Sequence, residues 1–332
     1  MSVRVLQPGM FTTVQDVGRQ GFQRDGVPVS GAMDAFALRT ANMLVGGADT
    51  DAGLEITLAG PTLAFESGAL VALTGGHADA FAGDVPLPLW RAVWLPKGTE
   101  LRIGRLESGC RTYLAIAGGI DEPAVLGGRS TFTRAGFGGH EGRALIQGDE
   151  LPLGVLSPLA ARIAAALAGE GTRSVVASWG IGPSIRPPYS ASPTVRLLEG
   201  AHTAALTSDS CTDLFTLPFR VASQSDRMGY RLEGVELRLQ RPMDLLSEGV
   251  AFGTMQLPPS GQPIVLMADR QTTGGYPRIG EVATVDLPLM AQLRPGDSVN
   301  FRPISLAHAQ HLYLERERDL AQARRAITLR HS

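Results

Sequence analysis

Turn-forming residues interrupt this chain at short intervals along almost its whole length. Its 332 residues include 40 Gly and 22 Pro, which are scattered rather than gathered in one segment. Short apolar runs lie between them, for example at 54–58, 63–65 and 70–74, and runs of this length bounded by turns are typical of strands. The pattern predicts a fold that is mainly β with a few helices.

Three similar segments indicate how the strands are grouped. In each of them a Gly-containing turn leads into a strand, and they lie at residues 96–101, 146–151 and 294–299. Because two of them precede residue 160 and the third lies near the end, we expect two barrel-like β units rather than one continuous sheet. An Ala-rich stretch at 158–171 marks the expected boundary. The predicted segments are a first domain at 1–165, a second domain at 172–305 that carries the main site motifs, and a C-terminal helix at 306–332.

Charge and composition argue against several classes of protein. The net charge of −2 provides no field that would gather nucleic acid or an anionic membrane. No apolar run approaches the length of a membrane span. Residues 1–8 show no signal peptide, and neither Cys110 nor Cys211 lies in a CxxC pattern. We therefore expect a reduced, cytoplasmic setting.

Lysine is almost absent, and this limits the chemistry. Lys97 is the only lysine in the chain, and it follows Pro96 in a predicted turn. A Walker A loop needs a Gly-Lys-Ser/Thr ending, which this position does not provide. A lysine nucleophile and a biotin attached to this chain's own lysine are disfavoured for the same reason. A nucleotide would therefore be held in another way or by another subunit.

The remaining common catalytic and metal motifs are also missing from the sequence. There is no Gly-x-Ser-x-Gly elbow and no Gly-x-Gly-x-x-Gly after a predicted strand. His308 and His311 lie one helical turn apart, but on a polar terminal helix where a solvated face is the better interpretation. We predict no metal site.

The stretch 247–281 is the best candidate for a functional site. Its apolar run 263–268 predicts a buried strand, which leads directly into the five polar residues 269–273 and a Gly-Gly pair. The segment 256–262 places two amides, a hydroxyl and a Pro-stiffened turn before the same strand. Polar side chains on a fixed backbone next to a buried strand are typical of a small-molecule site. A polar loop between two strands remains the alternative.

Two further polar, Gly-rich stretches, 12–34 and 225–231, complete the set of candidates. The carboxylates that could act as bases are Asp16, Asp34, Asp226 and Asp269. The guanidinium groups that could bind a carboxylate or phosphate are those of Arg19, Arg227, Arg270 and Arg278. Each neighbouring Asp and Arg could equally form a structural ion pair, and Asp34 is also well placed as the N-cap of a helix at 35–45.

Four segments of the sequence resemble a known family. They are GMFTTVQDVGRQGFQRDGVPVSGAMD, AIAGGIDEPAVLGGRST, SDRMGYRLEG and GTMQLPPSGQPIVLMADRQTTGGYPRIGEV. These segments resemble the C subunits of bacterial ATP-dependent 5-oxoprolinases, also called KipA-like proteins or allophanate hydrolase subunit 2. That family is related to the carboxyltransferase domain of urea carboxylase. The resemblance extends from the first predicted strand to the last one, near Phe301.

The resemblance implies a fold, a reaction and partners. The implied fold is two cyclophilin-like β-barrel domains. The implied reaction opens 5-oxoproline (pyroglutamate) to L-glutamate with hydrolysis of ATP. The implied partners are the other two 5-oxoprolinase chains, a KipI-like B chain and a LamB/YcsF-like A chain, and ATP with Mg²⁺ would be held by, or together with, one of them.

We predict site residues from the polar stretches and the resemblance together. The predicted catalytic residues are Asp226, Arg227 and Asp269. The predicted substrate-binding residues are Gln15, Asp34, Gln256, Ser260, Gln262, Arg270, Gln271, Thr272, Gly275 and Tyr276. The urea carboxylase branch has Asn where this chain has Asp226, and the acid would repel a carboxylate-like intermediate. Two alternatives stay open: a carboxyltransferase that works with biotin on another chain, and a regulator that binds a KipI-like kinase inhibitor.

Overall fold

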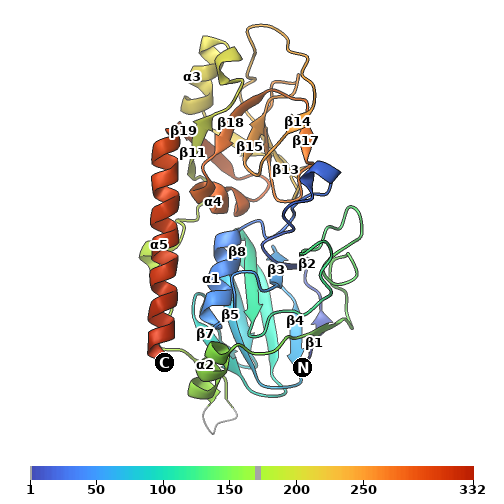
Figure 1. Cartoon of the computed structure of the whole chain (residues 1–332), viewed down its shortest axis with the longest axis vertical. Helices are drawn as coiled ribbons and strands as arrows, with labels where there is room; N and C mark the ends of the chain where they lie inside the picture. The colour runs from blue at the N-terminus through green and yellow to red at the C-terminus, as the bar shows by residue number, and fades with distance from the viewer. Residues whose placement is uncertain (1, 169–172) are drawn as a thin grey trace. The chain divides into compact units, whose positions relative to one another are not determined.

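The computed structural model describes residues 2–168 and 173–332 (Figure 1). Within these residues lie 19 strands and five α-helices. The predicted fold, mainly β with a few helices, is confirmed. No helix in this part of the chain is both long and apolar enough to cross a membrane.

The chain divides into two compact units, each assembled from separate parts of the sequence. Unit 1 consists of Met1–Arg19, Ser30–Arg186 and Arg318–Ser332, and unit 2 consists of Gln20–Val29 and Pro187–Glu317. The long C-terminal helix α5 (Leu306–Arg330) contributes residues to both. The sequence predicts separate segments at 1–165, 172–305 and 306–332. That each of them is a domain in its own right stays a prediction.

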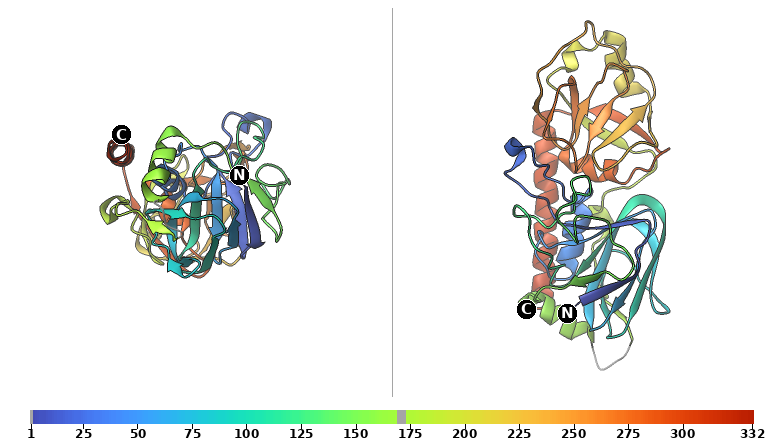
Figure 2. Two further views of the ribbon diagram at one scale, coloured as in Figure 1. Left: turned by 90° about the horizontal axis from the view of Figure 1, so that it is seen from below. Right: turned by 90° about the vertical axis from the view of Figure 1, so that its right-hand side faces the viewer.

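The sheet of unit 1 is built around two long antiparallel strands, β5 (Ala69–Ala82) and β8 (Glu100–Ile116). Their register is irregular between Gly75 and Ala80, and Figure 2 shows that both strands curve. The sequence predicts only 70–74 as a strand here. The strand continues because bulges absorb the glycines that would otherwise end it.

Eight shorter strands extend this sheet to ten. The main path runs β10-β7-β5-β8-β4-β1-β9, with β3 joining β8 to β2, and β6 pairing with β5. Their bounds are β1 (Ser2–Gln7), β2 (Phe11–Gln15), β3 (Gly53–Thr57), β4 (Thr62–Phe65), β6 (Val85–Pro86), β7 (Ala92–Leu95), β9 (Glu150–Pro152) and β10 (Val175–Val176). Alternating side chains such as Val3, Val5, Leu54 and Ile56 are fully buried and form one hydrophobic core.

Two helices pack on the sheet of unit 1. Helix α1 (Ala35–Leu44) lies against β5 and β8, and Asp34 caps it as predicted, because its carboxylate accepts a hydrogen bond from the Ala37 amide (2.9 Å). Helix α2 (Pro158–Ala168) covers most of the Ala-rich stretch predicted as a helix or linker. Residues 169–171 of that stretch lie outside the described residues.

Seven strands of unit 2 close into a barrel. Their order is β11-β18-β15-β16-β13-β12-β19, and the closing pair, β11 and β19, is parallel. The bounds are β11 (Thr194–Glu199), β12 (Phe219–Val221), β13 (Gly229–Glu233), β15 (Thr254–Gln256), β16 (Ile264–Leu266), β18 (Arg278–Val282) and β19 (Ser298–Pro303). Val195, Met255 and Val265 are fully buried. The buried strand predicted at 263–268 is confirmed as β16.

Three smaller elements surround the barrel strands. The strands β14 (Glu248–Gly249) and β17 (Thr273–Gly274) pair only with each other, and we call this pair the β14–β17 ribbon. Helix α3 (Ser208–Thr216) packs against β19, and helix α4 (Leu287–Ala291) follows β18 in the sequence. The ribbon is formed by the same polar stretch that the sequence singles out, so it bears directly on the site.

Candidate functional site

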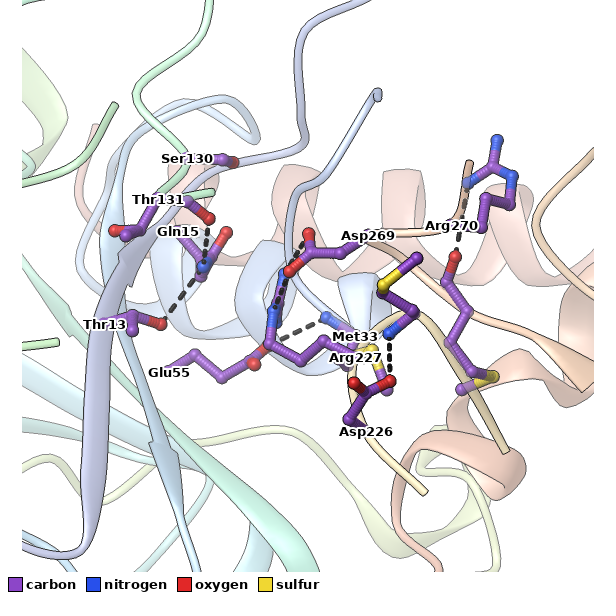
Figure 3. A network of polar contacts seen from close by, with 12 residues as sticks. Thr13, Gln15, Met33, Glu55, Ser130, Thr131, Asp226, Arg227, Asp269 and Arg270 are labelled. Carbon is purple, nitrogen blue, oxygen red and sulfur yellow. Dashed lines mark hydrogen bonds and ion pairs between the residues drawn. The ribbon is translucent and has the colours of Figure 1, made fainter. Parts of the chain in front are cut away.

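Arg227 and Asp269 form a buried ion pair in unit 2. The Arg227 Nε donates to Asp269 Oδ2 (2.8 Å), and its second terminal nitrogen donates to Oδ1 (3.1 Å) (Figure 3). Arg227 precedes β13 and Asp269 follows β16, so the pairing of these two strands places the residues opposite each other. Because both carboxylate oxygens accept from one guanidinium, the pair holds a fixed geometry. The structural ion pair that the sequence left open is therefore present.

Asp226 supports the turn that presents Arg227. Its Oδ1 accepts hydrogen bonds from the backbone amides of Met228 (2.8 Å) and Gly229 (3.3 Å), and the residue is exposed. This is an Asx turn, which fixes the chain direction into β13. The catalytic role predicted for Asp226 stays a prediction, and the bonds that it makes are structural.

Arg270 is buried with few strong partners. Its side chain is 7% exposed and lies over the ring of Phe252, with 5.8 Å from its central carbon to the ring centroid. Its Nε and one terminal nitrogen reach the carbonyls of Val250 and Met267 at 3.4 and 3.5 Å. Within the described residues no carboxylate lies within 4.0 Å of it. Burial lowers the pKa of Arg270 from its ordinary value, while Glu281 and Asp269 act in the opposite direction.

Glu281 is a functional candidate that the sequence reasoning missed. It lies on β18 opposite Thr254 of β15, whose hydroxyl donates to Glu281 Oε1 (3.1 Å). Burial raises the pKa of Glu281 above its ordinary value, and the Thr254 hydrogen bond, Arg278 and Arg270 oppose that rise. The sequence shows Glu281 only as one acid inside a strand. Its pairing with Thr254 depends on a register that the sequence does not reveal.

Gln256 lies on the same strand as Thr254, two residues further on. Its side chain is 1% exposed, and its Nε2 has no hydrogen-bond partner within the described residues. A buried amide donor without a partner is rare in proteins, and it marks a place where a ligand or water is expected. The predicted substrate-binding role of Gln256 thus has a free donor to support it.

Three of the predicted substrate-binding residues line hollows beside the exposed ring of a fourth, Tyr276. Tyr276 is 46% exposed and borders two hollows. The larger, of about 590 Å³, is lined by Gly275 and by prolines and leucines, and the smaller, of about 280 Å³, is lined by Ser260 and Gln262. The side-chain amide of Gln262 is already used in two hydrogen bonds with Gly234. Its Oε1 accepts from the Gly234 amide (2.9 Å), and its Nε2 donates to the Gly234 carbonyl (3.3 Å). The Ser260 hydroxyl accepts from the Gln262 backbone amide at 3.4 Å.

Gln271 and Thr272 lead from Arg270 into the β14–β17 ribbon. Gln271 is exposed, whereas Thr272 is half-buried and accepts a hydrogen bond at its carbonyl from the Val250 amide (3.1 Å). Arg278, which pairs with Gln256 on the neighbouring strand β18, forms an ion pair with Glu248 of the ribbon (2.5 Å). The ribbon therefore borders the segment that carries most of the predicted residues of unit 2.

Gln15 and Asp34 belong to unit 1. Gln15 is fully buried at the end of β2, and its Nε2 donates to Thr13 Oγ1 (3.1 Å) and to the Thr131 carbonyl (3.2 Å) (Figure 3). Its Oε1 accepts no hydrogen bond within the described residues. The Asp34 carboxylate caps α1 and is fully buried. Asp34 therefore has the capping role that the sequence offered as its alternative.

A buried acid and phenol that the sequence did not indicate lie beside Asp34. Tyr113 donates to Glu55 Oε2 (2.7 Å) and accepts from the Asp34 amide (2.8 Å), and the Met33 amide donates to the same Glu55 oxygen (2.8 Å). Burial raises the pKa of Tyr113 well above its usual value, and the negative charge of Glu55 adds to this. The phenol thus remains protonated and holds the start of α1 in place.

Asp16 also has a structural environment. Its carboxylate accepts from the amides of Gly18 (2.8 Å) and Arg129 (2.5 Å) and from the hydroxyl of Ser130.

Lys97 is exposed in the turn before β8, where the sequence places it. Within the described residues no three His, Cys, Asp or Glu side chains gather in a way that could hold a metal ion.

The chain belongs to the family described as carboxyltransferase domain, subdomain A and B, which matches residues 25–303. Among curated relatives, it is 38% identical to the C subunit of 5-oxoprolinase from Escherichia coli over 96% of this chain and 97% of that protein. It is 36% identical to the C subunit of 5-oxoprolinase from Haemophilus influenzae over 98% of each.

A solved structure supports the fold. The crystal structure of K. lactis urea amidolyase matches 97% of this chain with a TM-score of 0.86 at 30% identity. The chain spans 20% of that much longer protein, so the fold is shared with one part of it.

Proposed function

We propose that this chain is the C subunit of an ATP-dependent 5-oxoprolinase, which opens 5-oxoproline to L-glutamate with hydrolysis of ATP. One observation carries the proposal. The match to two proteins named as the C subunit of 5-oxoprolinase covers nearly the full length of this chain and of each of those proteins. A match of that extent includes the loops that carry Arg227, Asp269 and Arg270. A shared fold alone would be a weaker basis, because one fold serves many reactions.

The chemistry of the reaction fits the charges of unit 2. A lactam carbonyl is a poor electrophile. Transfer of the γ-phosphoryl group of ATP to its oxygen releases ADP and makes the ring carbon open to attack by water. The ring C–N bond then breaks with the nitrogen leaving as the amine, and hydrolysis of the remaining acyl phosphate gives L-glutamate and inorganic phosphate. The phosphoryl oxygens carry negative charge during the transfer, and fixed guanidinium groups stabilise such charge. In unit 2 the guanidinium of Arg227 is already paired with Asp269, whereas that of Arg270 forms no ion pair with a carboxylate within the described residues.

ATP and the partner chains form part of the proposal. Lys97 lies in an exposed turn and cannot form a Walker-type phosphate loop. We therefore place ATP and Mg²⁺ with, or shared with, a partner chain. The partners proposed are a KipI-like B chain and a LamB/YcsF-like A chain, and the word "subunit" in the names of the relatives supports an assembly of this kind. A cytoplasmic location belongs to the same proposal.

A carboxyltransferase acting with biotin on another chain is the second candidate. The likeness to urea amidolyase over 97% of this chain favours it. The Asn expected at position 226 in that branch could accept the same two amide hydrogen bonds as Asp226, since both offer a side-chain oxygen. The turn geometry is therefore compatible with both functions, and the charge at 226 is what differs.

Phosphate release tests the proposal directly. This chain is mixed with its two proposed partner chains and ATP, with and without 5-oxoproline. Release that requires 5-oxoproline and all three chains is the expected result. If the chains associate but release no phosphate, the 5-oxoprolinase proposal is wrong, and urea with a biotin carrier becomes the next substrate to assay.

A further inference from the structure

One face of the barrel wall in unit 2 carries polar side chains where apolar ones are usual. Thr254 and Gln256 alternate with buried Met255 on β15, so both lie on the side of the strand away from Met255. Glu281 of β18 pairs with Thr254, and Arg278 pairs with Gln256, because the register shifts between Met255 and Gln256. All of these belong to unit 2, so the arrangement is internal to it.

The β14–β17 ribbon lies against this polar face. A Cβ atom placed on Gly274 of β17 would be 2.4 Å from Gln256 Nε2, so the ribbon backbone and the amide are in close contact. The Val250 carbonyl, next to β14, accepts from Arg270. Arg278 and Glu248 join the ribbon to β18 by an ion pair. Thr254 and Gln256 on this face are buried from bulk water, whereas Arg278 is partly exposed, and burial strengthens electrostatic interactions at the buried side chains.

Two buried donors next to the ribbon are incompletely used, one on this face and the other after β16. Within the part of the chain that the structure describes, Arg270 makes only the two long hydrogen bonds to carbonyls and a contact with Phe252, although a guanidinium has five N–H groups. The Nε2 of Gln256 makes no hydrogen bond within the described residues. Glu281 is close enough to Arg270 for each to affect the pKa of the other, yet they form no ion pair within 4.0 Å.

We propose that Arg270, Gln256 and Glu281 form the binding site for the carboxylate group of a small cyclic-amide acid. The proposal rests on the proposed function and assigns the 5-oxoproline carboxylate to this face. The guanidinium supplies the charge that carboxylates select, and the amide of Gln256 supplies a neutral donor. Glu281 in its neutral form adds an O–H donor, and in its ionised form it repels the ligand.

Binding should therefore depend on the protonation of Glu281. The groups that act on Glu281 are Thr254 on β15, Arg278 on its own strand and Arg270 after β16. The other acids of this region are already in ion pairs, Glu248 with Arg278 and Asp269 with Arg227. As pH rises through the pKa of Glu281, its ionised form competes for Arg270 and repels the ligand carboxylate. The dissociation constant of 5-oxoproline is expected to rise over that range.

The test is direct binding to the assembled complex without ATP. Two probes are titrated by calorimetry: 5-oxoproline, and 2-pyrrolidinone, which has the same lactam ring without the carboxylate. Arg270→Gln should weaken 5-oxoproline binding roughly 10- to 100-fold, the loss expected for one charge-assisted contact, and should leave 2-pyrrolidinone unaffected. Glu281→Gln should flatten the pH dependence. Arg220→Gln and Glu199→Gln, exposed on other barrel strands, are matched controls.

The possible results separate the two proposals. If the wild-type complex binds 5-oxoproline and Arg270→Gln binds it equally well, the carboxylate site is wrong. Absence of 5-oxoproline binding to the wild-type complex also overturns it. Failure of the proposed function is detected separately, as lack of 5-oxoproline-dependent phosphate release. If Arg270→Gln does not assemble, the isosteric Glu281→Gln decides through its pH profile, because an unchanged profile contradicts the site.

Discussion

At the scale of single residues, the structure separates acids that look alike in sequence. Asp226 and Asp269 each adjoin an Arg in a polar stretch, yet Asp226 is an exposed turn-former and Asp269 is held in a buried pair with Arg227. Burial and partner, rather than residue type, decide what each can do. Glu281, inconspicuous in the sequence, is the acid of this region whose pKa burial raises.

The two aspartates are expected to differ in their effect on stability. Asp269→Asn removes the bidentate carboxylate from buried Arg227 and should lower the free energy of unfolding by about 3 to 5 kcal/mol. Asp226→Asn keeps an oxygen that accepts the same amide bonds, so it should change stability by less than about 0.5 kcal/mol. Urea denaturation of both variants checks this. Equal losses would contradict the assignment of structural roles.

Glu281 should also make stability depend on pH. Its pKa in the folded state is raised above the ordinary value of 4.5, so the folded protein binds a proton more tightly than the unfolded chain does. Stability is therefore lost as pH rises from about 4.5 through the raised pKa. Glu281→Gln should raise the Tm at pH 7 to 8, with the difference shrinking towards pH 4. A difference that grew on acidification would reverse this account.

At the scale of elements, the sequence predicts strands well where apolar runs are bounded by turns. Strand β16 and the capped helix α1 are examples. The β14–β17 ribbon was not predictable, because two-residue strands carry no periodic pattern and depend on distant partners. Glu248 pairs with Gly274 and Gly249 pairs with Thr273. The polar face of β15 and β18 was missed for a related reason, since it requires knowledge of their register.

The two glycines of the ribbon provide a matched comparison. A Cβ at Gly274 would press on the Gln256 amide at 2.4 Å, whereas a Cβ at Gly249 meets nothing within 4 Å. Gly274→Ala should therefore displace the amide, weaken 5-oxoproline binding several-fold and cost about 1 kcal/mol of stability, because a flexible side-chain end can move aside. Gly249→Ala should change neither. Calorimetry and urea denaturation of the pair test this, and equal behaviour would place Gln256 outside the site.

At the scale of the whole molecule, composition predicts the fold class but not how the chain is divided. Dispersed Gly and Pro indicated many short strands, and a closed barrel is present in unit 2. The assembly of each unit from distant segments, such as Gln20–Val29 with Pro187–Glu317, leaves no local signal in the sequence. The predicted site residues accordingly fall in both units, with Gln15 and Asp34 in unit 1.

The barrel closes through contacts between chain segments far apart in sequence, and this closure should dominate the stability of unit 2. Phe219 of β12 and Phe301 of β19 are both buried, with ring centroids 6.0 Å apart, and β19 also forms the parallel closing pair with β11. Phe301→Ala should cost about 3 to 5 kcal/mol in urea denaturation. Tyr313→Ala on the exposed side of α5 is the control, with a change below about 0.5 kcal/mol. A loss below about 1 kcal/mol for Phe301→Ala would mean that this aromatic contact does not hold the closing strand, because removing a Phe ring from a packed interior typically costs about 3 to 5 kcal/mol.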